Sequence, residues 1–427
     1  MKTVLLLSPT GRERKHLPAV AANLNCRVIF QEFAADYFDR QLSGDAEPDS
    51  AALDTLSLIE EIVSRYTRER IEGVTSGIGY PGMLVASLIA GRLGLPGTTV
   101  ESVLLCEHKY YARAAQQKLT PSATPSFQIV PPDGFGERGA PDIPFPLFLK
   151  PVKSCFSINA QKVSSLPELL RAARTRHMPA WFLSPFNDLL KAHTNYEYDA
   201  SHLLVETLLE GAQVSLEGYV FRGRVYILGI IDSVMFPGTI SFERFVYPSR
   251  LPAEVQSRMA RIAETFISGI GYDNALFNME LMYNAASGEI HIIEVNPKIA
   301  SQFTDLFDKV DGTSSYAPLL QIALGEEPAR TSVRGEFKLA ASCVLRTFED
   351  RRVLRTTSAA QLAELTRKFP DARIETFVSE GQLLSDTMQD GKSFRYALVN
   401  IGANSASELD AKLDSCKKLL DFQFAAP

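Results

Sequence analysis

The sequence lacks most of the features that would assign it to a specialised class of protein. Its five cysteines are spread singly, and none has the spacing of a zinc or redox motif, so we expect a reducing compartment. Lysine and arginine number 44 against 50 aspartate and glutamate residues, which gives a net charge of −6. Such a chain has no bulk positive field to hold nucleic acid or an anionic membrane.

Long apolar runs are missing as well. The longest, Met83–Ala90, is too short to cross a bilayer. The opening residues hold only a four-residue apolar run before Ser8, which is too short for a signal peptide. We therefore expect a cytoplasmic protein with neither membrane nor nucleic-acid partners.

What is present is the composition of an ordinary globular protein. Apolar residues make up 45% and charged residues 22%, which excludes disordered and fibrous classes. A chain of 427 residues fits roughly two to four packed modules.

The first part of the chain alternates strand and helix patterns. Strands are predicted at residues 3–7, 26–30 and 71–75, and helices at 13–24, 49–67 and 83–93. Strands that alternate with helices form a parallel sheet covered on both faces. The pattern changes after a Pro- and Gly-rich stretch at residues 119–144. Beyond it, successive strand patterns predict antiparallel units, and the last hundred residues mix strands and helices as a small α+β lobe.

Two segments can be compared with known nucleotide-binding motifs. Gly77–Gly82 fits G-x-G-x-x-G and opens a helix, but it follows a third strand and contains Pro81, so a tight turn lining a substrate site is the better interpretation. Asp390–Ser393 ends like a phosphate loop, but Asp386 stands where the loop requires glycine, and we reject it.

The strongest pattern is a pair of acidic strands, Ala275–Tyr283 and Glu289–Val295, joined by a turn-forming stretch. A hairpin centred near Ser287 would place Glu280 opposite Glu294, and the residues two positions before and after them, Asn278 and Asn296, opposite each other. Like charges directly opposite destabilise a sheet pair. Two carboxylates and an amide oxygen on apolar strands therefore indicate a hard cation such as Mg²⁺, rather than a solvent-facing polar stripe.

Two further segments have the chemistry of a nucleotide site. Lys150 ends an apolar strand, where an ammonium needs an anion such as a phosphate unless it merely reaches solvent. The next residues include Ser154 and Ser157, whose loop could cover phosphates with amides and hydroxyls. The stretch 203–218 has the pattern of a strand, a hinge and a second strand. Such a hinge can offer backbone groups to a purine edge, although alone it predicts only a hairpin.

Together and in this order, these elements resemble the ATP-grasp superfamily, in particular its carboxylate–amine ligase branch of L-amino acid ligases and carboxylase-type enzymes. The resemblance covers roughly residues 1–330. It implies an α/β and α+β architecture with a Rossmann-like parallel-sheet domain, a two-lobed nucleotide grasp and a small C-terminal α+β lobe. The expected units are residues 1–105, a connecting helix and linker at 106–145, a small grasp subdomain at 146–210, a large one with the metal site at 211–330, and the lobe at 331–427.

The resemblance also implies roles for individual residues. ATP would be bound by Lys109, Lys150, Ser154, Ser157, the adenine hinge of Glu206, Thr207, Leu208 and Leu209, and Gln213 with Glu217. One or two Mg²⁺ ions, or Mn²⁺ in their place, would be held by Glu280, Glu294 and Asn296. Lys298 would stabilise the transferring phosphoryl group, and Arg244 would bind a substrate carboxylate.

The sequence departs from the family pattern at three points. Gln213 stands where the family often has the glutamate that contacts ribose, and Glu217 is the residue that could share this task. The loop after Lys150 lacks the usual glycines. The Asn-Pro-Arg of the family becomes Asn296-Pro297-Lys298, which keeps the charge but loses bidentate recognition.

The implied activity is an ATP-dependent ligase that forms an amide through an acyl phosphate and releases ADP and phosphate. Its partners would be a small carboxylate, for which an amino acid is the candidate in this branch, and an amine, and a homodimer is common in the family. Two alternatives stay open: an ATP-binding regulatory protein without turnover, and a biotin-carboxylase-like component, which would need a separate carrier because the chain has no biotinyl-lysine segment.

Overall fold

The computed structural model describes residues 1–32, 53–131, 140–155, 157–175, 178–329, 333–387 and 392–426. Its strands form a parallel sheet, a small antiparallel sheet, a large antiparallel sheet and a two-stranded pair of β14 (Val353–Arg355) and β17 (Gln423–Phe424). None of the helices in these ranges has the length and apolar character needed to span a bilayer.

The N-terminal part contains the predicted parallel sheet, with strand order β2-β1-β3. Its elements are β1 (Lys2–Leu7), α1 (Gly11–Asn23), β2 (Cys26–Gln31), α3 (Thr55–Arg68), β3 (Gly73–Ser76) and α4 (Leu84–Leu93), followed by α5 (Val100–Glu107) and α6 (Lys109–Leu119). The start of the helix predicted at 49–67 lies outside the described residues. The alternation of strand and helix in the sequence therefore predicted this fold class correctly.

The small sheet has the order β4-β7-β5-β6 and is antiparallel throughout. Its strands are β4 (Phe127–Val130), β5 (Leu147–Pro151), β6 (Gln161–Val163) and β7 (Leu203–Thr207), with helices α7 (Leu166–Thr175) and α8 (Ala180–His193) between them. Strand β4 comes from the stretch that was expected to be a connecting helix and linker, and α8 was not predicted.

The large sheet has eight strands in the order β12-β11-β8-β9-β10-β13-β16-β15. Its strands are β8 (Ala212–Phe221), β9 (Arg224–Met235), β10 (Phe242–Tyr247), β11 (Ala275–Tyr283), β12 (Ile290–Asn296), β13 (Leu339–Thr347), β15 (Arg373–Thr376) and β16 (Phe394–Ala403). The helices along it are α9 (Ala253–Gly269), α10 (Thr304–Asp311), α11 (Tyr316–Ala323), α12 (Ala359–Lys368) and α13 (Ala406–Leu420). Because β10 pairs with β13, the C-terminal strands β13, β15 and β16 continue this sheet, whereas β14 and β17 pair separately.

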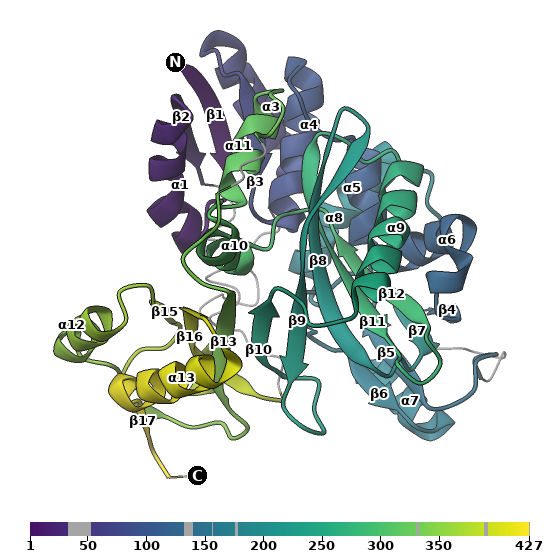
Figure 1. Cartoon of the computed structure of the whole chain (residues 1–427). Helices are drawn as coiled ribbons and strands as arrows, with labels where there is room; N and C mark the ends of the chain where they lie inside the picture. Colours follow the sequence, from purple (N-terminus) through teal and green to yellow (C-terminus); the bar gives the residue numbers. More distant parts are fainter. Residues whose placement is uncertain are drawn as a thin grey trace.

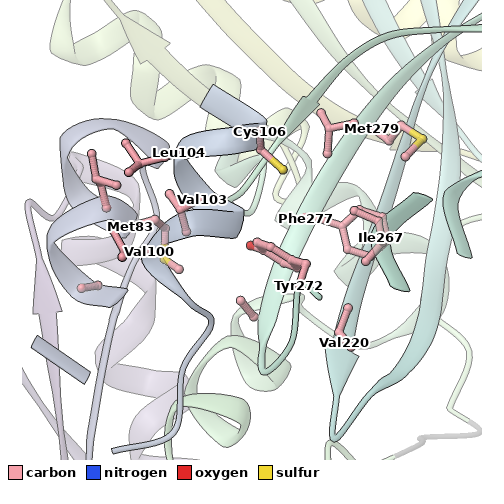
Figure 2. Packing of buried hydrophobic residues seen from close by; sticks show 14 of the residues in the cluster. Met83, Val100, Val103, Leu104, Cys106, Val220, Ile267, Tyr272, Phe277 and Met279 are labelled. Atoms are coloured by element: carbon pink, nitrogen blue, oxygen red, sulfur yellow. The ribbon is translucent and has the colours of Figure 1, made fainter. Parts of the chain in front are cut away.

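One hydrophobic core joins the N-terminal helices to the large sheet. Met83 and Val103, from the N-terminal helical region, belong to the same buried cluster as Tyr272, Phe277 and Met279 (Figure 2). In Figure 1 the small sheet with α7 and the C-terminal helices α12 and α13 lie on opposite sides of β9 and β10. The N-terminal helices, the small sheet and the C-terminal helices thus lie around the large sheet.

Candidate active site

A cavity of about 1140 Å³ lies where the three large parts of the fold meet. Its walls come from the loop after β1, the turn after β3, the small sheet and one face of the large sheet as far as β13 and β16. Of the residues proposed from the sequence, it is lined by Lys109, Lys150, Ser154, Ser157, Glu206, Thr207, Leu208, Leu209, Gln213, Glu280, Glu294, Asn296 and Lys298. Glu217 and Arg244 are not part of its lining.

The acidic hairpin has the register that the sequence predicted. Glu280 of β11 lies directly opposite Glu294 of β12, and Asn278 lies opposite Asn296. Gln213 of the neighbouring β8 donates a hydrogen bond from Nε2 to Glu280 Oε2 at 2.8 Å. Two carboxylates thus face each other across one strand pair, inside the cavity.

The two carboxylates have pKa values shifted in opposite directions. Burial, together with the charge of Glu294 opposite, raises the pKa of Glu280 to about 8. Burial would also raise the pKa of Glu294, but the ammonium groups of Lys109 and Lys150 outweigh it and lower this pKa to about 2. Facing carboxylates behave in this way because both cannot hold a negative charge at low cost.

The donor set fits a hard divalent cation. Asn296 donates its Nδ2 to Asn278 Oδ1 at 3.0 Å, so its Oδ1 is the atom left for a ligand. Two carboxylates and an amide oxygen match the oxygen preference of Mg²⁺, which usually takes its remaining ligands from water and substrate phosphates. Within the described ranges, no group of three or more His, Cys, Asp or Glu side chains is placed to hold a metal ion.

Lysine side chains surround the acidic pair. Lys109, the first residue of α6, lies with its Nζ 3.4 Å from Glu294 Oε2. Burial alone would lower the pKa of Lys109, but the carboxylates of Glu294 and Glu107 raise it by more than burial lowers it. The net shift of this pKa is therefore upward, and the ammonium stays charged. Lys298 follows β12 and also lines the cavity. The cavity thus contains positive charge close to its two carboxylates.

Glu206 is engaged with two cations of the protein itself. Its carboxylate accepts a hydrogen bond from Arg113 Nε at 2.7 Å and forms an ion pair with Lys150. The three side chains are 3–7% exposed. Burial would raise the pKa of Glu206, but Arg113 and Lys150 outweigh it and lower the pKa below its usual value. The neighbouring hinge residues line the cavity, whereas the Glu206 carboxylate ties α6 to β5.

The loop after β5 contains a pair that the sequence reasoning missed. Lys153 is buried and forms an ion pair with Glu107 at the end of α5. Its Nζ lies 4.5 Å from the ring centroid of Tyr80 and 5.1 Å from that of Phe186, and both contacts are cation–π interactions. No local pattern could indicate these contacts of Lys153, because the rings come from the η1 turn (Gly79–Met83) and from α8.

Glu217 lies beneath the cavity and not in it. It accepts hydrogen bonds from Asn278 Nδ2 at 2.6 Å and from the backbone N–H of Ala300 at 3.3 Å. Burial raises its pKa to about 7. The carboxylate therefore supports the strand that carries Glu280, and the expected contact with ribose does not fit its position.

Arg244 requires a correction. Its guanidinium donates to Asp410 Oδ1 of α13 at 2.6 Å, on the face of the sheet turned away from the cavity. Its neighbours Phe242 and Phe245 line the cavity instead. A register shift between Phe242 and Arg244 in the pairing of β10 with β9 interrupts the alternation on which a sequence prediction depends. The structure thus does not support Arg244 as a ligand of a substrate carboxylate.

The cavity also contains cations that the sequence did not single out. Arg346 of β13 and Arg395 of β16 line it, and so does Arg12, whose Nε donates to Glu375 Oε1 at 2.5 Å. The turn at Gly77–Gly82 contributes Gly79 and Tyr80 to the lining, as the interpretation of this segment as a tight turn beside a substrate site expected.

Comparisons with known proteins agree with this geometry. Residues 143–305 match the family model of the ATP-grasp domain. L-amino acid ligase from Bacillus licheniformis shares the fold at a TM-score of 0.73 and 17% identity, with 100% of this chain and 99% of that chain covered. Phosphoribosylglycinamide synthetase from Anaerococcus prevotii matches at 0.65 and 15%, with full coverage of both chains.

Biotin carboxylase from Campylobacter jejuni matches at a TM-score of 0.63 and 15% identity, covering 99% of this chain and 92% of that chain. At such identities these structures establish the fold alone. A comparison with curated protein sequences gives no match. The comparisons therefore show two things: residues 143–305 are similar to the ATP-grasp domain, and the chain as a whole has the fold of these three solved structures.

Proposed function

We propose that this protein is an ADP-forming carboxylate–amine ligase. A carboxylate oxygen of the substrate attacks the γ-phosphorus of ATP, the bond to the β-phosphate oxygen breaks, and an acyl phosphate and ADP result. An amine then attacks the acyl carbon, the bond from that carbon to the phosphate oxygen breaks, and phosphate leaves as the nitrogen loses a proton. The products are an amide, ADP and phosphate.

The observation that carries this proposal is the facing pair Glu280 and Glu294 with lysines around it in one cavity. Phosphoryl transfer requires little covalent chemistry from a protein, and depends on positioning and on neutralising charge. Lys109 and Lys298 supply positive charge beside the acids. The hinge residues Thr207–Leu209 lie along the same wall, where a purine would find backbone groups.

Glu280, Glu294 and Asn296 would hold Mg²⁺, which would supply positive charge to neutralise the charge that develops on the phosphate oxygens. Gln213 orients Glu280 through its hydrogen bond. Lys109 holds Glu294 in its ionised form, since the nearby ammonium outweighs the burial of that carboxylate.

The cavity also contains Cys155, which could in principle form a covalent acyl intermediate. Burial raises the pKa of this thiol to about 11, and a thiol that stays protonated is a poor nucleophile. Direct attack of the amine on the acyl phosphate is therefore the route that the site favours.

The test is ADP and phosphate release from Mg-ATP with small carboxylates and amines, offered singly and in pairs, with ADP distinguished from AMP by mass. ADP that forms only with a particular pair supports the proposal and identifies the substrates. AMP as the nucleotide product would contradict it. Tight ATP binding without turnover on any pair would favour a regulatory protein.

A matched pair of variants tests the acidic site. Glu294→Gln removes one carboxylate of the facing pair, and we expect ADP formation to fall at least 100-fold, since a metal ligand and the partner of Lys109 are lost together. Glu289→Gln makes the same change at an exposed position just before β12 and should leave the rate unchanged. A Glu294→Gln protein as active as wild type would overturn the assignment.

A further inference from the structure

A proton must leave the amine in the proposed ligase reaction, and few side chains of the cavity can accept it. Among the described residues no histidine lines the cavity, and its acidic side chains are Glu32, Glu107, Glu206, Glu280 and Glu294. Four of these already have a task. Glu32 pairs with Arg14, Glu206 is held by two cations of the protein, and the facing pair is the candidate metal site. Glu107 is the carboxylate that remains.

The carboxylate of Glu107 reaches the cavity past a glycine. Glu107 is the last residue of α5, and its side chain is 12% exposed. Its Oε1 lies 2.1 Å from the point where a Cβ on Gly79 would stand, so the absence of a side chain there leaves the room that the carboxylate occupies. The Cδ atom of Lys298 lies 3.7 Å from the same point. Oε1 of Glu107 is therefore beside the stem of the lysine that would stabilise the transferring phosphoryl group.

The two oxygens of this carboxylate have different surroundings. Oε2 of Glu107 forms the ion pair with Lys153, whose ammonium is itself held over the rings of Tyr80 and Phe186. In the part of the chain that the structure describes, Oε1 accepts no hydrogen bond. A negative charge at the C-terminal end of a helix is unfavourable, so the stability of α5 does not explain Glu107. One oxygen fixes the carboxylate, and the other is available to an N–H group in the cavity.

We propose that Glu107 binds the amine substrate and accepts its proton. The neutral amine donates an N–H to Oε1, and its lone pair attacks the acyl carbon of the acyl phosphate. The C–N bond forms, the bond from that carbon to the phosphate oxygen breaks and leaves its electron pair on phosphate, and the N–H proton passes to Glu107. The substrate class is a primary or secondary amine, such as the amino group of an amino acid. This role of Glu107 deepens the proposed ligase function, on which it rests, because it assigns the base of the second step.

Hydroxylamine separates the two steps of the reaction, because it is uncharged near neutral pH and attacks an acyl phosphate without the help of a base. The full-length protein receives Mg-ATP and the panel of carboxylates, with the amines in one arm and hydroxylamine in the other. Amides are measured by mass, and hydroxamates by their colour with iron(III). We expect Glu107→Gln to lower amide formation roughly 100-fold or more, as the loss of a general base does, and to leave hydroxamate formation within about threefold of wild type.

A second comparison guards against misfolding, because Glu107→Gln leaves the buried Lys153 without its anion. Lys153→Met removes that ammonium and places a flexible apolar side chain among the rings. Lys153→Met and the double variant with Glu107→Gln differ only at Glu107, and the ratio of amide to hydroxamate should fall roughly 100-fold or more from the first to the second. Glu101→Gln makes the same change at an exposed position in the first turn of α5 and should leave both products unchanged.

Two results would overturn this role of Glu107. One is an equal fall of amide and hydroxamate when Glu107 is replaced in either background, since a carboxylate that only supports the fold would affect both products. The other is amide formation that survives the replacement. Failure of the proposed ligase function shows separately, because a wild-type protein that is not a ligase forms neither ADP nor hydroxamate in the panel.

Discussion

Glu206→Gln is the substitution whose effect the structure determines most closely. The carboxylate lies between the Arg113 guanidinium and the Lys150 ammonium, with all three side chains 3–7% exposed. Glutamine keeps the shape and removes the charge, so two cations stay buried without their shared anion. Arg113 keeps its hydrogen bond to the carbonyl oxygen of Ile293, at 2.8 Å. In the described part of the chain, Lys150 forms no other ion pair.

Removing one partner of a buried ion pair costs about 3–5 kcal/mol. Because β5 and β7 both belong to the small sheet, we expect the loss to appear there first. Hydrogen exchange of peptides that cover these strands should accelerate by roughly two to four orders of magnitude, at 1.4 kcal/mol for each factor of ten. A lower thermal midpoint should accompany the change.

A second substitution tests the cause. Lys150→Met in the Glu206→Gln background removes the buried ammonium, and part of the lost stability should return, because replacing both partners by uncharged groups is far less costly than removing one. Glu210→Gln, at an exposed position four residues further on, should exchange like wild type. If Glu206→Gln exchanged like Glu210→Gln, Glu206 would not be the anion that stabilises this sheet.

Two further predictions concern other parts of the site. Burial raises the pKa of Glu217 to about 7 from 4.5. Between these two pH values, Glu217 is mostly protonated in the folded protein and mostly ionised in the unfolded chain, so its protonation stabilises the fold. This stabilisation is complete below pH 4.5 and is lost as the pH rises through 7, and the loss is about 3 kcal/mol at most. Urea unfolding midpoints should therefore show that Glu217→Gln loses less stability than wild type from pH 5 to pH 8. Equal losses in the two proteins would contradict this. Gly79→Ala would place a Cβ 2.1 Å from Glu107 Oε1, so we expect it to displace this carboxylate and lower ADP formation at least tenfold. Gly91→Ala, with nothing within 4 Å and a helical position in α4, should keep the activity and raise the thermal midpoint slightly; if the two variants behaved alike, the close approach at Gly79 would have no role.

The contrast between Arg244 and Arg346 shows where sequence reasoning stops. Arg244 lies between two phenylalanines, and its sequence context suggested a substrate pocket. Which face of a strand a side chain occupies depends on register, and the register shift in the pairing of β10 with β9 lies just before Arg244. Arg346 and Arg395 are 49 positions apart in the sequence numbering, and only the pairing of β13 with β16 places them side by side.

The sequence alone determined what local geometry can fix. Alternating strand and helix patterns predicted the parallel sheet, and a short connection between two apolar strands predicted Glu280 opposite Glu294, since a hairpin links register to the length of its turn. Tertiary structure decided the partners that come from distant segments. Lys153 lies among rings from η1 and α8, Glu206 joins α6 to β5, and Arg244 turns toward α13. These contacts depend on how whole elements pack, and a spacing rule along the chain contains no information about that packing.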